Sequence, residues 1–174
     1  MSIDRPDNDD LEQELDDIER LVQDNRQPEI IELCNRLEAR FPRRFELYFH
    51  RAQARSLSGD SAGALVDVST AISLQPKEPA LFFFRGTWHL NGGRIEDGVD
   101  DLTRVLALEE SLGTSYYADS ALFARAVGWL YLGEFEASRR DCDGVRPDIT
   151  GFVRGRVWKV ADVRKHATQQ LLPR

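Results

Sequence analysis

Large and small apolar residues recur along this chain with a spacing of 34 residues. Tyr48 and Phe82 hold one large position, and Ala52 and Gly86 hold a small position four residues later. A third copy begins six residues late, at Leu122. The recurring positions are Tyr48, Arg51, Ala52, Ala64, Val68, Ala71 and Pro76, then Phe82, Arg85, Gly86, Gly98, Leu102, Val105 and Glu110, then Leu122, Arg125, Ala126, Trp129, Ser138, Cys142 and Val145. The turn position inside each copy, and inside a weaker copy at the start, is Asn25, Gly59, Gly93 or Gly133. Two apolar stretches separated by a turn, repeated at this period, predict stacked pairs of antiparallel helices.

The repeat predicts an all-α chain of about four helical hairpins and one further helix. The hairpins are expected at residues 11–44, 45–78, 79–112 and 119–148, and the last helix at about 149–171. Asp148 and Thr150 are candidate caps of that last helix, and its apolar stripe would be Val153, Val157, Val160, Ala161 and Ala167. We expect the first helix to begin near Asp9 or Asp10, residues 1–9 to be disordered, and residues 10–172 to form one domain.

The pattern of large, small and turn positions resembles the tetratricopeptide repeat family. The resemblance covers residues 11–148 and implies a right-handed solenoid whose final helix covers the last hairpin. Three departures from the family pattern fall in the first, third and last copies, which have Glu14 at a large aromatic position, Glu110 at the terminal proline, and an early end at Gly144 and Pro147. Terminal repeats of a solenoid are expected to be atypical because one face has no neighbour.

Composition is that of an ordinary soluble protein, with 41% hydrophobic and 30% charged residues among 174. No apolar run approaches the roughly 18 residues that a membrane span needs. The acidic start lacks the hydrophobic region of a secretory signal, so we expect a cytoplasmic protein. Cys34 and Cys142 hold equivalent core positions of two separated hairpins, which predicts buried thiols and no disulfide.

Charge is polarised along the chain, although the net charge is only -7. Residues 1–24 contain ten acidic and two basic residues, whereas residues 146–174 contain seven basic and two acidic ones. These ends can be solvated faces, or they can attract a charged protein partner or a second copy head to tail. Nucleic-acid binding is not expected, because the basic segment lacks regular aromatic spacing and phosphate would be repelled by the whole chain.

An arginine precedes an aspartate by sixteen residues in three successive copies. The pairs are Arg51 and Asp67, Arg85 and Asp101, and Arg125 and Asp141. One member lies on each helix of its hairpin, so the spacing predicts three equivalent ion pairs that hold the two helices together.

The family resemblance also implies a concave groove lined by four positions of each first helix. The groove positions are Phe49, Gln53, Ser56 and Leu57, then Phe83, Thr87, Leu90 and Asn91, then Phe123, Val127, Leu130 and Tyr131. They would form an apolar, aromatic trough for a helix or an extended segment of a partner, unless the phenylalanines fill the seams between hairpins.

The family's clamp for acidic carboxyl termini is absent, because Phe49, Gln53, Phe84, Ser120 and Ala124 occupy its positions. The six-residue insertion within residues 111–118 carries Tyr116 and Tyr117, which are secondary candidates for contact with a partner.

Motifs of enzymes and of metal sites are absent from the sequence, and the three histidines lie on different predicted helices. We therefore expect no metal, no cofactor and no catalytic activity. Three functions fit the remaining features: an adaptor that binds a protein segment in the groove, a small acidic inhibitor of the immunity or antitoxin kind, and a self-assembling structural subunit. The sequence specifies neither a partner nor an oligomeric state.

Overall fold

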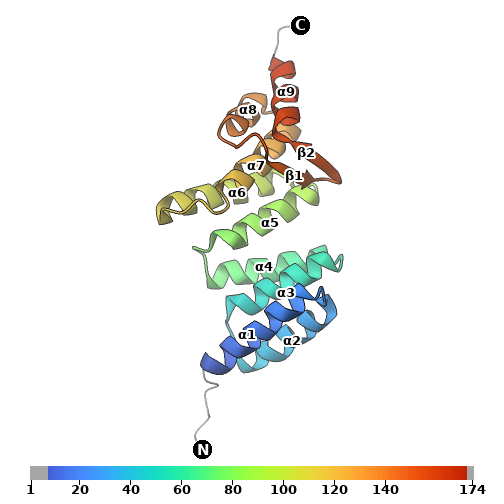
Figure 1. Cartoon of the computed structure of the whole chain (residues 1–174), viewed down its shortest axis with the longest axis vertical. Coiled ribbons are helices and arrows are strands. Elements are labelled where there is room, and N and C mark those ends of the chain that lie inside the picture. The colour runs from blue at the N-terminus through green and yellow to red at the C-terminus, as the bar shows by residue number, and fades with distance from the viewer. Residues whose placement is uncertain (1–7, 172–174) are drawn as a thin grey trace, which may run out of the picture. The chain divides into compact units, whose positions relative to one another are not determined.

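The computed structural model describes residues 8–171, which form nine helices and one two-stranded sheet (Figure 1). The all-α helical repeat predicted from the sequence is confirmed. The chain divides into two compact units, residues 1–76 and residues 77–174. The single domain expected over residues 10–172 stays a prediction.

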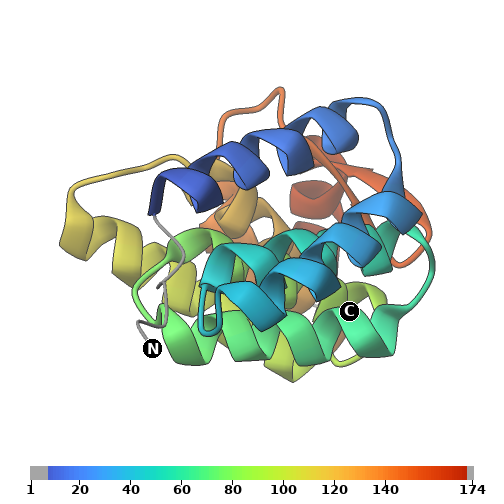
Figure 2. The same cartoon turned by 90° about the horizontal axis from the view of Figure 1, so that it is seen from below.

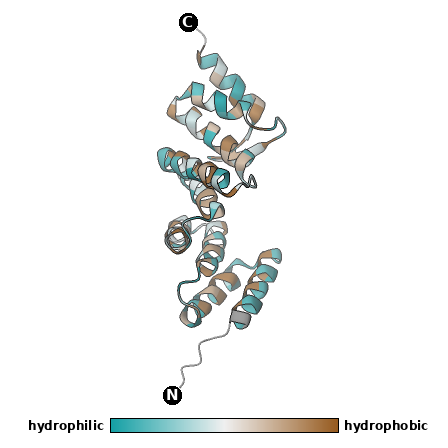
Figure 3. Ribbon diagram, turned by 90° about the vertical axis from the view of Figure 1, so that its left-hand side faces the viewer, coloured by the Kyte–Doolittle hydropathy of each residue, from teal (hydrophilic) through white to brown (hydrophobic). Residues whose placement is uncertain are grey.

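The first unit contains two helical hairpins. Its helices are α1 (Asn8–Gln23), α2 (Gln27–Arg40), α3 (Phe45–Leu57) and α4 (Ser61–Leu74), and each packs against the next in chain order (Figure 2). α1 carries both polar and apolar residues (Figure 3). Leu11 and Ile18 of its apolar stripe are buried with Ile30 and Leu37 of α2. The disorder expected for residues 1–9 lies largely outside the described residues, but α1 already includes residues 8 and 9.

The second unit contains the other two hairpins and a C-terminal segment. Its helices are α5 (Pro79–Asn91), α6 (Ile95–Leu112), α7 (Ala118–Leu132) and α8 (Phe135–Asp143). α5 and α6 approach closely at two glycines, because a Cβ on Gly98 would lie 2.9 Å from the carbonyl oxygen of Gly86. Part of the insertion predicted within residues 111–118 extends α6 to Leu112, and Gly113 then ends the helix with a φ of 67°.

All four hairpins turn in the same way. Asn25, Gly59, Gly93 and Gly133 have positive φ values of 54°, 87°, 84° and 79°. The amide after each of them donates to the carbonyl five residues back, as Arg26 does to Leu21 and Glu134 to Trp129, both at 2.9 Å. This is the six-to-one bond of a Schellman turn, which glycine or asparagine favours because the left-handed conformation strains other residues.

The last predicted helix begins later than expected. Residues 150–159 form a β-hairpin of β1 (Thr150–Val153) and β2 (Arg156–Lys159), and only Val160–Leu171 form a helix, α9. Arg154 and Gly155, with φ values of 51° and 75°, make the two-residue turn. Helix is unfavourable here because Gly151 and Gly155 would each cost about 1 kcal/mol in its interior.

α9 covers the last hairpin of the second unit, as a capping helix was expected to do. It packs against α8 and α7 through its buried Val160, Val163 and Ala167. Arg164 donates from Nη2 to the carbonyl oxygen of Cys142 at 2.8 Å, near the carboxyl end of α8. The guanidinium therefore satisfies a carbonyl that α8 leaves without an intrahelical partner.

Both cysteines are free and buried, as the sequence predicted. Burial raises the pKa of the Cys34 thiol to about 12 and that of the Cys142 thiol to about 11. Since the thiolate is the reactive form, both side chains act as small apolar residues of the core.

Candidate functional site

The predicted groove positions of the first unit lie along α3. Phe49, Gln53 and Ser56 are half-buried, and Leu57 at the end of the helix is 73% exposed. The Phe49 ring lies 6.3 Å from the ring of His50, centroid to centroid.

The predicted groove positions of the second unit lie on α5 and α7, and several are closed to a ligand. Leu90, Phe123 and Val127 are buried, with 0%, 2% and 0% of their surface exposed. Leu130 is half-buried, as are Phe83 and Thr87, whereas Asn91 and Tyr131 are exposed. Leu90 and Val127 thus fill the seams between helices. The alternative that the sequence left open concerned the phenylalanines, of which Phe123 is buried, whereas Phe49 and Phe83 are half-buried.

The β-hairpin covers part of this predicted groove. A Cβ on Gly151 would lie 2.8 Å from the Phe123 ring, so only glycine lets β1 approach α7 this closely. The Arg154 amide donates to Asn91 Oδ1 at 2.8 Å. The Tyr131 ring packs edge-on against the ring of Trp158, 6.1 Å between centroids, and Arg154 lies over the Tyr131 ring. Phe123, Asn91 and Tyr131 therefore contact the protein's own C-terminal segment.

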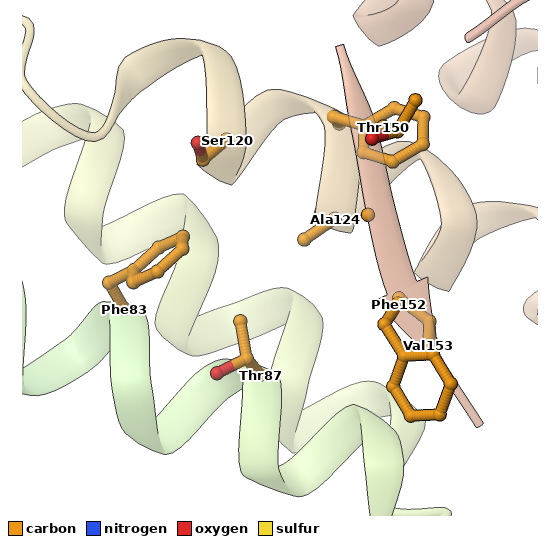
Figure 4. Close-up of a pocket in the computed structure, with 9 residues that line it drawn as sticks. Phe83, Thr87, Ser120, Ala124, Thr150, Phe152 and Val153 are labelled. Atoms are coloured by element: carbon orange, nitrogen blue, oxygen red, sulfur yellow. The ribbon is translucent and has the colours of Figure 1, made fainter. Parts of the chain in front are cut away.

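A cavity of about 220 Å³ remains open between α5, α7 and β1 (Figure 4). Phe83 and Thr87 line it on the α5 side, across from β1. The other lining residues are Ser120, Phe123 and Ala124 of α7 and Thr150, Gly151, Phe152 and Val153 of β1. Sites for drug-sized molecules usually occupy about 300–1,000 Å³, so this cavity suits a side chain better than a whole cofactor.

The lining of this cavity is mainly apolar, with hydroxyl groups as its polar side chains. None of its nine residues has an ionisable side chain, so the lining holds no group for acid–base catalysis at neutral pH. Thr87 Oγ1 donates to the Phe84 carbonyl at 2.9 Å, which leaves its lone pairs to accept. Ser120 is exposed at the first turn of α7. The cavity can hold an apolar group of a ligand, and the hydroxyl groups of its lining can form one or two hydrogen bonds with that ligand.

The loop that carries Tyr116 and Tyr117 lies beside this cavity. Tyr117 packs on Phe83 with ring centroids 4.9 Å apart, and the Tyr117 amide donates to the Glu109 carboxylate at 2.7 Å. Burial raises the pKa of the Tyr117 hydroxyl. Tyr116 packs against Tyr117 and is 85% exposed. The structure therefore brings Phe83 and Tyr117 into contact, and Phe83 also lines the cavity together with Thr87.

Ser120 and the β1 residues are part of the cavity lining but were not among the candidates from the sequence. The missed signal is two short pairs of aromatic and β-branched residues, Phe152-Val153 and Val157-Trp158, on either side of Arg154 and Gly155, which is typical of two strands joined by a short turn. Interpreting these residues as a helical stripe hid the strand that borders the cavity.

Solved structures of helical repeat proteins are similar to this chain. MamA from Desulfovibrio magneticus RS-1 matches with a TM-score of 0.67 over 92% of this chain and 90% of its own, at 12% identity. A tetratricopeptide repeat protein from Parabacteroides merdae ATCC 43184 matches with a TM-score of 0.65 over 76% of this chain and 50% of its own, at 18% identity. A thermophilic protein of the same kind from Thermus thermophilus matches with a TM-score of 0.58 over 88% and 77%, also at 18% identity. This chain has the tetratricopeptide repeat fold.

The tetratricopeptide repeat fold agrees with the resemblance found in the sequence. No protein-family model and no curated protein sequence matches the chain. Tetratricopeptide repeats are stacked helical hairpins, and solenoids of this kind present extended concave surfaces that bind other molecules. Within residues 8–171, no helix combines the length and the apolar character that crossing a bilayer requires.

Proposed function

We propose that this protein is a non-enzymatic interaction module that binds a segment of a partner protein at the cavity between α5, α7 and β1. The observation that carries the proposal is the cavity itself. Its lining is mainly apolar and uncharged, and its volume of about 220 Å³ matches a side chain rather than a small-molecule ligand. Buried apolar pockets that receive a side chain are where protein interfaces concentrate their binding free energy.

The proposed site is narrower than the groove expected from the sequence. It keeps Phe83, Thr87 and the loop residues Tyr116 and Tyr117, and it adds Ser120 and β1. Leu90 and Val127 support the site from the core, and the α3 residues are outside it. The partner is a protein or peptide, and the expected cytoplasmic location belongs to the same proposal.

The test is affinity capture from cells that produce the protein, with a variant that fills the cavity. Ser120→Trp places an indole at the cavity from an exposed position, so the core of the unit is left unchanged. Leu57→Trp is the matched control, because Leu57 is exposed on α3 and lies outside the site. We expect the partner to be captured by the wild type and by Leu57→Trp, and to be lost with Ser120→Trp. Equal capture by all three proteins would contradict a role for the cavity.

A further inference from the structure

All four consecutive residues of β1 line the cavity. Side chains alternate between the two faces of a strand, so residues of both faces border the cavity, as they do beside a strand edge. β2 occupies the other edge, so the cavity adjoins the edge that carries no partner strand within the described residues.

The register of the hairpin shows which backbone groups lie on that edge. Val153 and Arg156 flank the two-residue turn, so they form the hydrogen-bonded pair that closes it. Hydrogen-bonded and non-hydrogen-bonded pairs alternate along an antiparallel ladder. The N–H and C=O groups of Phe152 and Thr150 therefore point away from β2. Within residues 8–171, neither residue makes a backbone hydrogen bond outside the hairpin.

The side chains of β1 have a fixed inner and outer face. Gly151 and Val153 point toward the helices, since Gly151 contacts Phe123 and Val153 is 4% exposed. Phe152 and its cross-strand neighbour Val157 point outward and are 62% and 63% exposed. A strand added beside β1 would continue both faces, with alternate side chains directed into the cavity and out to solvent.

The hairpin is basic in a chain that is acidic overall. Residues 150–159 contain Arg154, Arg156 and Lys159 and no acidic residue. Arg154 lies over the Tyr131 ring and Arg156 over the Trp158 ring, the latter at 4.1 Å from the centroid. None of the three cations has a carboxylate partner within 4.0 Å among the described side chains. This charge favours a partner with acidic residues near the hairpin.

We infer that the partner segment binds as an extended strand added to the free edge of β1. Its backbone pairs with Phe152 and Thr150, one of its apolar side chains enters the cavity beside Phe83, and its acidic side chains lie near Arg154 and Arg156. Main-chain hydrogen bonds supply affinity and the cavity supplies selectivity, as in other cases of strand addition. This inference rests on the proposed function and specifies the chemistry of the ligand.

The test uses a defined probe peptide, acetyl-Asp-Leu-Thr-Leu-Thr-Leu-Asp-amide, labelled with a fluorophore and followed by anisotropy. Two N-methylated forms of the probe carry methyl groups either on the leucine amides or on the threonine amides. In an added strand only one of these sets faces β1, so we expect one methylated form to bind about ten-fold more weakly and the other to keep its affinity. A probe with lysine in place of both aspartates should also bind more weakly, because the hairpin is basic.

Two protein variants test the same edge from the other side. Phe152→Pro removes the amide hydrogen that points away from β2, at an edge position where proline is tolerated. Phe152→Ala keeps that hydrogen and removes the exposed ring. Phe152→Ala therefore measures what the ring itself contributes to binding, and we expect Phe152→Pro to bind about ten-fold more weakly than Phe152→Ala. The methylated probes use wild-type protein, so they remain decisive if the proline variant does not fold.

The outcomes separate this inference from the proposed function. Equal binding of both methylated probes, or no binding of any probe while capture still depends on Ser120, would overturn strand addition and leave the interaction module in place. Equal capture by the wild type and Ser120→Trp, together with no binding of any probe, would overturn the two together. A protein that dimerises through β1 without a probe, and whose dimer is abolished by Phe152→Pro, would assign the edge to a second copy instead.

Discussion

At the scale of single residues, one arginine in each of three hairpins is held by the aspartate sixteen residues later. Arg51 and Asp67 form two hydrogen bonds of 2.9 and 2.8 Å, and Arg125 and Asp141 form two of 2.8 Å. Arg85 and Asp101 form the same bidentate pair, so all three predicted ion pairs are confirmed. Arg51 also donates to Glu38 and Asn35 of α2, and Arg125 to Thr103 of α6. Each of these two arginines therefore joins its own hairpin to the preceding one.

Removing one member of such a pair should cost much more than removing both. Asp141 and Arg125 are largely buried, so Asp141→Leu or Arg125→Met alone leaves an uncompensated charge. We expect each single change to lower the free energy of unfolding by about 3 kcal/mol, and the double change to cost less than the sum. Urea denaturation of the four proteins gives this coupling. Strictly additive effects would show that the pair is not coupled.

His50 makes stability depend on pH. Burial lowers its pKa, an effect that the nearby carboxylates of Glu19 and Glu46 oppose only in part, and its Nδ1 has no hydrogen-bond partner among the described residues. A histidine in the unfolded chain takes up a proton near its ordinary pKa of 6.5, whereas the folded state stays neutral to a lower pH. The unfolded state thus binds more protons, and the free energy of unfolding falls as pH drops through 6.5.

The expected result is a shallower pH dependence in His50→Gln. Urea denaturation of wild type and variant between about pH 7.5 and 5 measures the slope of unfolding free energy against pH. His166→Gln is the control, because His166 is exposed on α9. A slope in His50→Gln equal to that of the wild type would exclude this residue as its source.

At the scale of secondary-structure elements, the four turns have a common geometry that depends on a left-handed residue. Gly59 has a φ of 87° and no atom near the position of an added Cβ. An added side chain would therefore meet no other atom, and it would destabilise the fold only through the strain of a left-handed backbone. We expect Gly59→Ala to lower the free energy of unfolding by about 1 to 2 kcal/mol.

Asn25 provides the comparison for this effect. It holds the same turn position in the first hairpin with a φ of 54°, so Asn25→Gly should be neutral or slightly stabilising. Thermal unfolding of Gly59→Ala and Asn25→Gly measures both changes in stability. A destabilised Asn25→Gly with an unchanged Gly59→Ala would contradict the backbone explanation.

The C-terminal segment shows where helical patterning misleads. Val153, Val157 and Val160 are spaced as on a helix, yet Val153 and Val157 belong to the two strands and point to opposite faces of the hairpin. Short apolar runs fit either periodicity, and glycines inside the run favour the strand. The strand is preferred because Gly151 allows β1 to lie against Phe123 of α7, a contact between residues distant in the sequence.

At the scale of the whole molecule, the repeat determines the helical hairpins. The β-hairpin of β1 and β2 determines how much of the predicted groove stays accessible to a ligand. Each unit has its own buried residues, and the proposed site lies entirely within the second unit. In that unit β1 and β2 take up part of the predicted groove, and the remaining cavity acquires a strand edge. The chain thus combines a helical repeat with a sheet edge at one site.

The local pattern of residues was enough to predict the helical hairpins, the four turns, the three ion pairs and the two buried thiols. These features depend on contacts at a fixed spacing within or between neighbouring helices, and a spacing can be read along a chain. The cavity could not be found in this way, because it depends on how residues 150–159 fold back onto α5 and α7. The burial of Leu90 depends on its packing against Gly98 of α6 and Gly128 of α7. Such long-range packing depends on whether side chains fit in three dimensions, which has no fixed spacing in the sequence.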